Sequence, residues 1–258
     1  MSGAWAILKK DFVSYHRSWV GVLVLFAFLL LSGIFFTIFV LSYSQLSFEA
    51  ARQAYRGVED LSITAFIMGA FLLNVGVLFL FFAPLLSMRS LAEEKRVGTL
   101  EFLYTYPLSD FEIVLGKYLS LVSQSVLLFL PTLAYAAVIH WLGAKVDWGI
   151  IGGGTAGCFL LGASFLAMGL FFSSLTENQM LAGGLTFAFL LGLWMLEWLT
   201  GFLPSFLSTR LADLSPFMHF RDFSLGIVDL TDVSYFLCLI SFFFFLTLRD
   251  VESRNWKG

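Results

Sequence analysis

The chain has 258 residues, of which 59% are hydrophobic and 13% are charged, and its mean hydropathy is +0.88. Because soluble domains carry about 25% charged residues, this composition excludes a soluble protein and predicts one that spans a membrane. The formal net charge of −3 and the lack of a basic stripe argue against binding to nucleic acid.

Residues 3–17 predict a short amphipathic helix that lies on the membrane surface. Apolar side chains recur every three or four positions and so share one helix face: Trp5, Leu8, Phe12 and Tyr15. Lys9, Lys10 and Arg17 can reach lipid headgroups. No small-residue cleavage site of a signal peptide follows, so we expect the first span to be retained.

Six apolar runs follow, and each is long enough to predict a membrane-spanning helix. They lie at about residues 19–43, 63–88, 113–141, 149–172, 180–203 and 233–248. The last of these runs is only just long enough to cross. Pro84 and Pro131 fall inside the second and third runs and predict bends there. We therefore expect an all-α polytopic membrane protein in which residues 1–258 form a single domain.

Two of the connecting segments are long enough to carry structure of their own. Residues 44–61 are polar and predict an outer loop with a helical turn or two. Residues 204–232 are more patterned, because apolar side chains recur at helical spacing between Pro216 and Asp229: Phe217, Phe220, Phe223 and Ile227. This pattern predicts short helices at the outer face, between the fifth and sixth spans.

The distribution of positive charge predicts the orientation of the chain. If the N-terminus is cytoplasmic, ten of the 15 Lys and Arg residues lie in inner segments and five in outer ones. Positive charge concentrates on the cytoplasmic side of membrane proteins, so we expect both termini to be cytoplasmic. The charged segment 89–112 is then cytoplasmic as well.

Segment 89–112 carries eight charged residues between two apolar runs. Ser90 with Glu93, and Ser109 with Glu112, each match the capping-box spacing that begins a helix. Gly98 interrupts the first helix, and Thr99 can cap a short second one that Pro107 ends. Residues 99–107 thus predict a folded elbow with an apolar edge, formed by Leu100, Leu103 and Tyr104. Such an edge indicates a docking surface.

Two stretches carry a resemblance to a known family. EEKRVGTLEFLYTYPLSDFEIVLGKYLS resembles the cytoplasmic coupling segment of type-2 ABC (ABC-2) exporter permeases, in which an acidic-basic run precedes Gly-Thr-Leu-Glu, a Pro and a Gly-Lys. LSPFMHFRDFSLGIVDLTDVSYFL, at 214–237, is similar to the outer segment before the last span of that family. The resemblance covers essentially the whole chain, and it is closest to gliding-motility-associated permeases.

The resemblance implies roles for individual residues. It places an ATPase contact on the coupling elbow, at Glu93, Glu94, Arg96, Gly98, Thr99, Leu100, Glu101, Leu103 and Pro107. It places an outer lid at Pro216, His219, Phe220, Phe223 and Gly226. ATP-driven closure of the ATPases would push residues 99–107 and tilt the first, second and fifth spans, in an alternating-access mechanism.

The resemblance also implies partners and a location. These are two copies of an ABC ATPase, a second permease that is identical or homologous, and the bilayer of the bacterial cytoplasmic membrane; an extracytoplasmic accessory subunit is left open. The chain has no GxxxxGK[ST] phosphate loop. We therefore expect it to bind no cofactor, with ATP and Mg held by the ATPase.

Two other function classes remain as alternatives. For a membrane enzyme, Glu93-Glu94 is similar to the paired glutamates of CAAX-type proteases, but Gly98 stands where their arginine is expected. The histidines, His16, His140 and His219, fall in separate segments and predict no metal site. The other alternative is a scaffold that transmits force from its ATPase without transporting a substrate.

Several residues inside the spans invite a structural or a functional interpretation. Glu197 is a carboxylate within a span and thus a functional candidate, although Trp194 and Trp198 also suit an interfacial belt. Asn74 predicts an interhelical hydrogen bond. Gly149, Gly153 and Gly157 lie four apart and predict close helix packing. Cys158 and Cys238 lie in apolar runs, and we expect free thiols.

Overall fold

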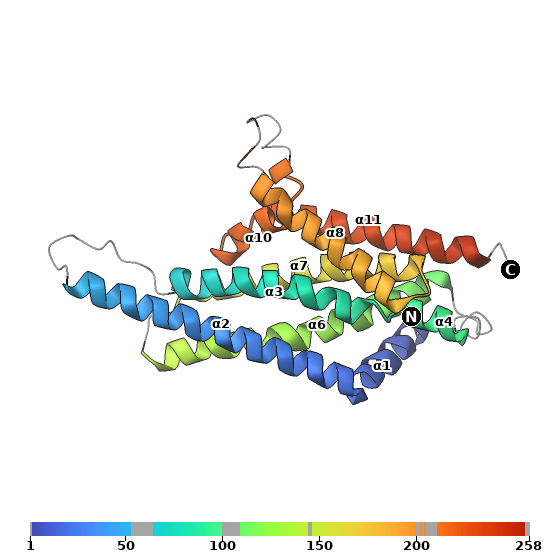
Figure 1. Ribbon diagram of the computed structural model, residues 1–258, viewed down its shortest axis with the longest axis horizontal. Coiled ribbons are helices and arrows are strands. Elements are labelled where there is room, and N and C mark those ends of the chain that lie inside the picture. Colours follow the sequence, from blue (N-terminus) through green and yellow to red (C-terminus); the bar gives the residue numbers. More distant parts are fainter. Residues whose placement is uncertain are drawn as a thin grey trace.

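The computed structural model describes residues 2–52, 64–99, 109–143, 146–199, 202, 204 and 211–255. Within these ranges the chain is helical and contains no strand (Figure 1). Six helices are long and apolar enough to cross a membrane. The structure therefore confirms the prediction of an all-α, six-span membrane protein.

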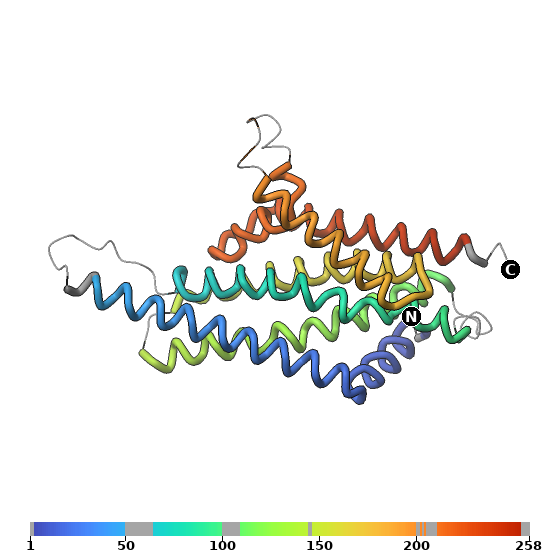
Figure 2. Tube along the Cα trace, in the orientation of Figure 1, coloured from blue at the N-terminus to red at the C-terminus, as the bar shows by residue number. Residues whose placement is uncertain are grey.

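The spans are α2 (Trp19–Arg52), α3 (Ala70–Ser87, preceded by the π-helical turn η1, Ala65–Gly69), α6 (Asp110–Trp141), α7 (Trp148–Leu175), α8 (Gln179–Leu199) and α11 (Leu230–Asn255). Three shorter helices are α1 (Ser2–Arg17), α4 (Ala92–Val97) and α10 (Pro216–Ser224). Figure 2 shows that α1, α4 and the end of α11 lie at one end of the bundle.

Helix α7 is the centre of the bundle, packed against α3, α6, α8, α10 and α11. In the most apolar 18-residue stretch of α7, 67% of the residues are buried. The corresponding share is 22% for α2, 17% for α8 and 22% for α11. Small residues on α7 allow this close approach of several helices. The three outer helices therefore present apolar surface that lipid or another subunit can cover.

Aromatic side chains fill the contact between α2, α3 and α6. Phe28, Phe79 and Phe129 are fully buried, with ring centroids 6.5 Å apart for Phe28–Phe79 and 4.7 Å for Phe79–Phe129. Rings at these separations pack edge-to-face or tilted, which is the favourable arrangement. Much of the high phenylalanine content is thus core packing.

Helix α1 packs along α6 through small residues. A Cβ on Gly116 would lie 2.8 Å from the Ala4 carbonyl oxygen and 2.9 Å from Ile7 Cβ. The buried face of α1 is therefore formed by Ala4 and Ile7, whereas Trp5 is 66% exposed. Trp5 therefore faces outward, whereas the other residues of the predicted apolar stripe, Leu8, Phe12 and Tyr15, are partly buried, and Tyr15 packs against the core.

Two boundaries differ from the predicted ones. Helix α2 continues to Arg52, so residues 44–52 are helix instead of loop. This part contains no Gly or Pro, and Gln45, Leu46 and Glu49 favour the helix. The last span, α11, runs from Leu230 to Asn255 and is longer than predicted.

Candidate functional site

Helix α4 begins in a different way from the one predicted. Its N-cap position is Leu91, without a side-chain cap from its own turn, and Ser90 belongs to the turn that closes α3. The cap comes from α7: Ser173 Oγ accepts hydrogen bonds from the backbone N–H groups of Leu91 and Ala92, both at 3.1 Å. The predicted capping box of Ser90 with Glu93 is therefore wrong, because a distant serine satisfies these donors.

The end of α4 agrees with the prediction. Gly98 closes the helix with φ of +76°, a left-handed conformation that glycine adopts without strain. Thr99 Oγ1 lies 3.4 Å from the Glu94 carbonyl oxygen, to which it donates. The predicted interruption of the helix at Gly98 is thus confirmed.

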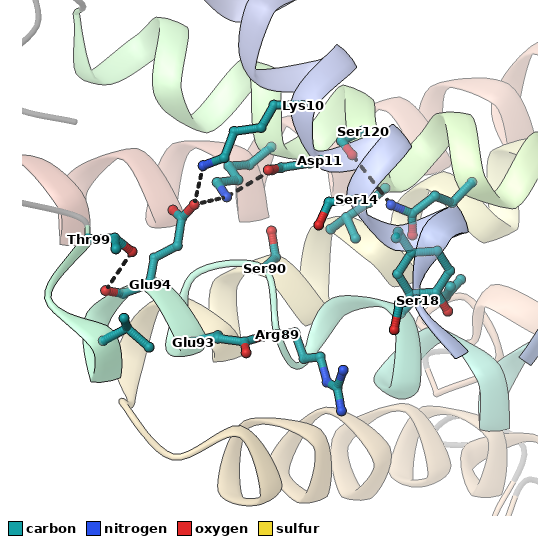
Figure 3. Close-up of a pocket in the computed structure, with 16 residues that line it drawn as sticks. Lys10, Asp11, Ser14, Ser18, Arg89, Ser90, Glu93, Glu94, Thr99 and Ser120 are labelled. Atoms are coloured by element: carbon teal, nitrogen blue, oxygen red, sulfur yellow. Dashed lines mark hydrogen bonds and ion pairs between the residues drawn. The ribbon is translucent and has the colours of Figure 1, made fainter. Parts of the chain in front are cut away.

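Glu94 of α4 is the centre of an ion cluster shared with α1 and α6. Its Oε1 lies 2.6 Å from Lys117 Nζ, and Lys117 also contacts Asp11 Oδ2 at 2.8 Å (Figure 3). Lys10 Nζ approaches Glu94 at 3.5 Å. The Lys117 side chain is only 3% exposed, and a lysine buried this deeply requires opposite charges beside it.

Lys95, the next residue, connects α4 to two other helices. Its Nζ donates to the Ser174 carbonyl oxygen at the end of α7 and lies 3.4 Å from Asp250 Oδ2 of α11. The Lys95 side chain is also 3% exposed. It thus carries a buried positive charge to the C-terminal end of α7, where backbone carbonyls favour a cation.

Adjacent residues of α4 therefore reach four helices, because Glu94 pairs with α1 and α6 while Lys95 pairs with α7 and α11. We call this arrangement the α4 node; it comprises Glu94, Lys95, Lys117, Asp11 and Asp250. The side chains of Lys95 and Lys117 are buried. A displacement of α4 would therefore either move the helices that contact it or break buried ion pairs. The node thus joins α4 to α1, α6, α7 and α11 through polar side-chain contacts.

The structure brings together only part of the predicted ATPase contact. Glu93, Glu94, Arg96, Gly98 and Thr99 are described. Arg96 is exposed, as is the neighbouring Val97, whereas Glu94 turns inward. The other predicted contact residues, Leu100, Glu101, Leu103 and Pro107, lie outside the described residues.

The second predicted capping box, at the start of α6, is confirmed. Ser109 Oγ accepts from the Glu112 backbone N–H at 3.3 Å, and Glu112 Oε2 accepts from the Ser109 backbone N–H at 3.4 Å. Ser109 and Glu112 lie three positions apart in the sequence. The segment that leaves α4 thus returns into α6 at a well-capped helix start.

The predicted outer lid contains the helix α10, which is seated deeply on α7 and α3. Phe217, Phe220 and Phe223 are buried, while Ile227 lies beyond the helix and is 55% exposed. A Cβ on Gly157 would lie 2.4 Å from Phe223 Cβ, and one on Gly76 would lie 2.7 Å from Phe220 Cε1. Glycines on both spans therefore make room for the phenylalanines of α10.

The glycine stripe of α7 packs as predicted at two of its three positions. Gly157 faces Phe223, and a Cβ on Gly153 would lie 3.0 Å from Gly226 Cα. Gly226 itself has φ of +82° and approaches Ile150 Cα, to which a Cβ would come within 2.8 Å. Gly149 meets only Asp147, which caps its own helix.

His219 ties α10 to the start of α11. Its Nδ1 lies 2.6 Å from Asp232 Oδ1, and its Nε2 lies 3.0 Å from the Asp213 carbonyl oxygen. The ring stacks on Tyr235 with centroids 3.9 Å apart, and Tyr235 Oη donates to the Leu214 carbonyl oxygen at 2.7 Å. His219, which the resemblance assigns to an outer lid, thus holds α10 against the start of α11.

The remaining predicted polar residues lie away from the α4 node. Asn74 Nδ2 donates to the Ala70 carbonyl oxygen at 2.9 Å within its own helix, and the interhelical hydrogen bond stays a prediction. Glu197 is half-buried near the end of α8, between Trp194 and Trp198, whose ring centroids are 5.5 Å apart. Both interpretations of Glu197 stay predictions.

Lys95, Lys117 and Ser173 are the functional candidates that the sequence alone does not single out. Lys117 has a detectable signal, since a lysine within an apolar run demands a buried partner. Lys95 is hidden among four consecutive charged residues, from Glu93 to Arg96. Ser173 has no signal, because its role as a cap depends on a residue 82 positions away.

A family model described as ABC-2 family transporter protein matches residues 5–248. Among curated proteins, none matches the chain. The family match covers most of α1, all of α4 and α10, and α11 as far as residue 248, so it includes every residue of the α4 node except Asp250.

Proposed function

Because the chain belongs to the ABC-2 family of transporter proteins, we propose that it is an exporter permease that works by alternating access. The family makes the chain a multi-pass membrane subunit of an ABC transporter whose ATPase is a separate partner. We propose two copies of that ATPase, which hold ATP and Mg, and a location in the bacterial cytoplasmic membrane with both termini inside. The closer likeness to gliding-motility-associated permeases belongs to this proposal too.

The α4 node is the observation that supports this mechanism. Residues 99–107 follow α4 directly, and we propose that they dock on the ATPase through Leu100 and Leu103, with Glu101 at the rim. Movement of this segment would displace α4. Glu94 would pass the displacement to α1 and α6, and Lys95 would pass it to α7 and α11.

This route changes the mechanism expected from the resemblance. There, the first, second and fifth spans tilt together. The polar side-chain contacts of α4 instead reach α1, α6, α7 and α11, and α4 also packs against α7 and α8. We therefore propose that α6, α7 and α11 respond first, and that α10 responds through its seat on α7.

A second permease, identical or homologous, would cover one of the exposed apolar faces. Helices α2, α8 and α11 carry large exposed side chains, including Phe26, Met180 and Phe242 at 65%, 84% and 56%. We propose that the transport path forms between two permeases that meet at one of these faces.

The test is a charge placed on the docking segment. Leu103→Asp should release the ATPase, because a buried apolar anchor contributes ~2–4 kcal/mol at an interface hot spot and an unpaired buried charge costs more. Co-purification of the ATPase with the tagged permease measures this loss. Leu142→Asp, in the turn after α6, is the matched control and should keep the ATPase.

If Leu103→Asp retains the ATPase as well as wild type, the docking proposal is wrong. The same node would also serve a subunit that transmits force without transport. Substrate flux in proteoliposomes that contain both subunits distinguishes these functions, because a force-transmitting scaffold hydrolyses ATP without flux.

A further inference from the structure

A polar pocket of about 450 Å³ lies between α1, the turn from α3 to α4, and α6 (Figure 3). Its volume is in the range of sites that hold small ligands. Three basic and three acidic side chains line it, so its formal charge is balanced: Lys10, Arg89, Lys117, Asp11, Glu93 and Glu94. It adjoins the α4 node but extends beyond the ion pairs of that node.

Four buried polar atoms on the wall of this pocket have no hydrogen-bond partner among the residues that the structure describes. They are Tyr15 Oη, Arg89 Nε, Glu94 Oε2 and Gln124 Oε1. Gln124 is 5% exposed, and its amide nitrogen is already used, since Nε2 donates to Ser120 Oγ at 3.4 Å. Buried polar atoms without partners cost free energy, and all four belong to residues that line this one pocket, so the pocket is a candidate ligand site.

These atoms define the chemistry of the ligand. Burial raises the pKa of Tyr15 to about 12, partly opposed by the positive charge of Arg89, so the hydroxyl stays a protonated donor at neutral pH. Arg89 Nε is a second donor, whereas Glu94 Oε2 and Gln124 Oε1 are acceptors. A simple anion would leave the acceptors unpaired, and a simple cation would leave the donors unpaired. A zwitterion satisfies both and suits the balanced charge.

The depth of the pocket relative to the membrane indicates which zwitterions can reach it. Trp5 on α1 and Trp19 at the start of α2 are 66% and 90% exposed, and exposed tryptophans mark the headgroup level of a membrane protein. Tyr15 lies between them in sequence and lines the pocket. The ligand is therefore expected at the depth of phospholipid headgroups.

We propose that this pocket binds a phosphoethanolamine group, with the phosphate facing Tyr15 and Arg89 and the ammonium facing Glu94 and Gln124. The bound group bridges α1, α4 and α6, and so holds the N-terminal helix against the α4 node. Its source is either phosphatidylethanolamine from the bilayer or a soluble phosphoethanolamine compound. The proposal needs no ATPase, so its failure leaves the docking proposal untouched.

The experiment uses the full-length permease without its ATPase, in nanodiscs that hold equal parts of phosphatidylethanolamine, phosphatidylcholine and phosphatidylglycerol. Native mass spectrometry after release counts the lipids that stay bound. We expect phosphatidylethanolamine to be retained about tenfold over phosphatidylcholine, which corresponds to ~1.4 kcal/mol, because the methylated amine has no N–H to donate to Glu94 and Gln124.

Two variants test the pocket from opposite sides. Gln124→Met removes an acceptor and Arg89→Met removes a donor, and each should cut retention about tenfold. Thr132→Val is the matched control on α6, since Thr132 is buried and donates within its own helix to the Phe129 carbonyl oxygen. It should retain the lipid. If one pocket variant fails to fold, the other still decides the outcome.

Soluble glycerophosphoethanolamine distinguishes the two sources. If it displaces phosphatidylethanolamine, or binds when the lipid does not, the headgroup chemistry is supported and the ligand need not be a lipid. If only the lipid binds, the source is the bilayer. Equal retention of phosphatidylcholine or phosphatidylglycerol, equal binding of free glycine, or no retained headgroup at all would overturn the proposal.

Discussion

Removal of the buried lysine at the α4 node is the perturbation with the clearest expected magnitude. Lys117 holds Asp11 at 2.8 Å and Glu94 at 2.6 Å, and its side chain is 3% exposed. Lys117→Met keeps most of the length of the side chain but leaves both carboxylates without their shared cation. Removing one partner of a buried pair costs ~3–5 kcal/mol.

The loss of unfolding free energy in Lys117→Met should fall near the lower limit of the ~3–5 kcal/mol range. Asp11 is 21% exposed and can recover some hydration, and Glu94 keeps Lys10 at 3.5 Å. We therefore expect a loss of ~3 kcal/mol in the free energy of unfolding. The assay is unfolding of the purified chain in mixed micelles by titration with sodium dodecyl sulfate.

Two further variants isolate the electrostatic cause. Lys10→Met removes a cation that also contacts Glu94 but is 64% exposed, so it should cost under ~1 kcal/mol. Glu94→Gln combined with Lys117→Met should recover ~1–2 kcal/mol relative to Lys117→Met alone, because one of the unpaired carboxylates is then neutral. If Lys117→Met is as mild as Lys10→Met, the node is not a buried ion cluster.

The remaining predictions concern the lid, the fifth span and the topology. Gly157→Leu should cost ~1–3 kcal/mol of unfolding free energy by overpacking Phe223, whereas Gly152→Ala, whose Cβ meets nothing within 4 Å, should be nearly neutral. Glu197→Gln should impair flux in proteoliposomes while membrane insertion stays normal; wild-type flux would favour the interfacial interpretation. A reporter that is active only in the cytoplasm should work after Lys257 and be silent near Asp147, and activity at Asp147 would refute the orientation.

Features with local causes could be predicted from the sequence. The six spans follow from runs of apolar residues, and the capping box of Ser109 with Glu112 depends on two residues three positions apart. Gly98 ends α4 because a positive φ suits glycine. The surface of α7 that packs against α10 could be predicted in part, because Gly153 and Gly157 share one face of the helix.

Features with distant causes could not be predicted. Ser90 has the spacing of a cap, but Ser173 takes that role from another helix. The partners of Lys95 and Lys117 lie on α1, α4, α7 and α11, and no local pattern specifies which helices meet at one end of the bundle. Asn74 shows that a local partner can also be overlooked, because its amide nitrogen donates to the carbonyl oxygen four residues earlier in its own helix.

Glu94 and Arg96 were both predicted to contact the ATPase, but they differ in exposure and in their partners. Arg96 is exposed and free to meet an ATPase, whereas Glu94 is 12% exposed and paired inside the permease. We propose that Arg96 belongs to the docking surface and that Glu94 belongs to the transmission of movement. The division is consistent with their two-residue spacing, which places them on different faces of a helix.

The most direct test of the account is whether the node transmits movement from the ATPase to the spans. Spin labels at Lys9 on α1 and Ser253 on α11, in a Cys238→Ser background, report the distance between these helices with and without trapped ATP. We predict that this distance changes in the wild-type complex and stays constant in Glu94→Gln/Lys95→Met, with the ATPase still bound and hydrolysing ATP. A full ATP-dependent change in that double variant would contradict the account.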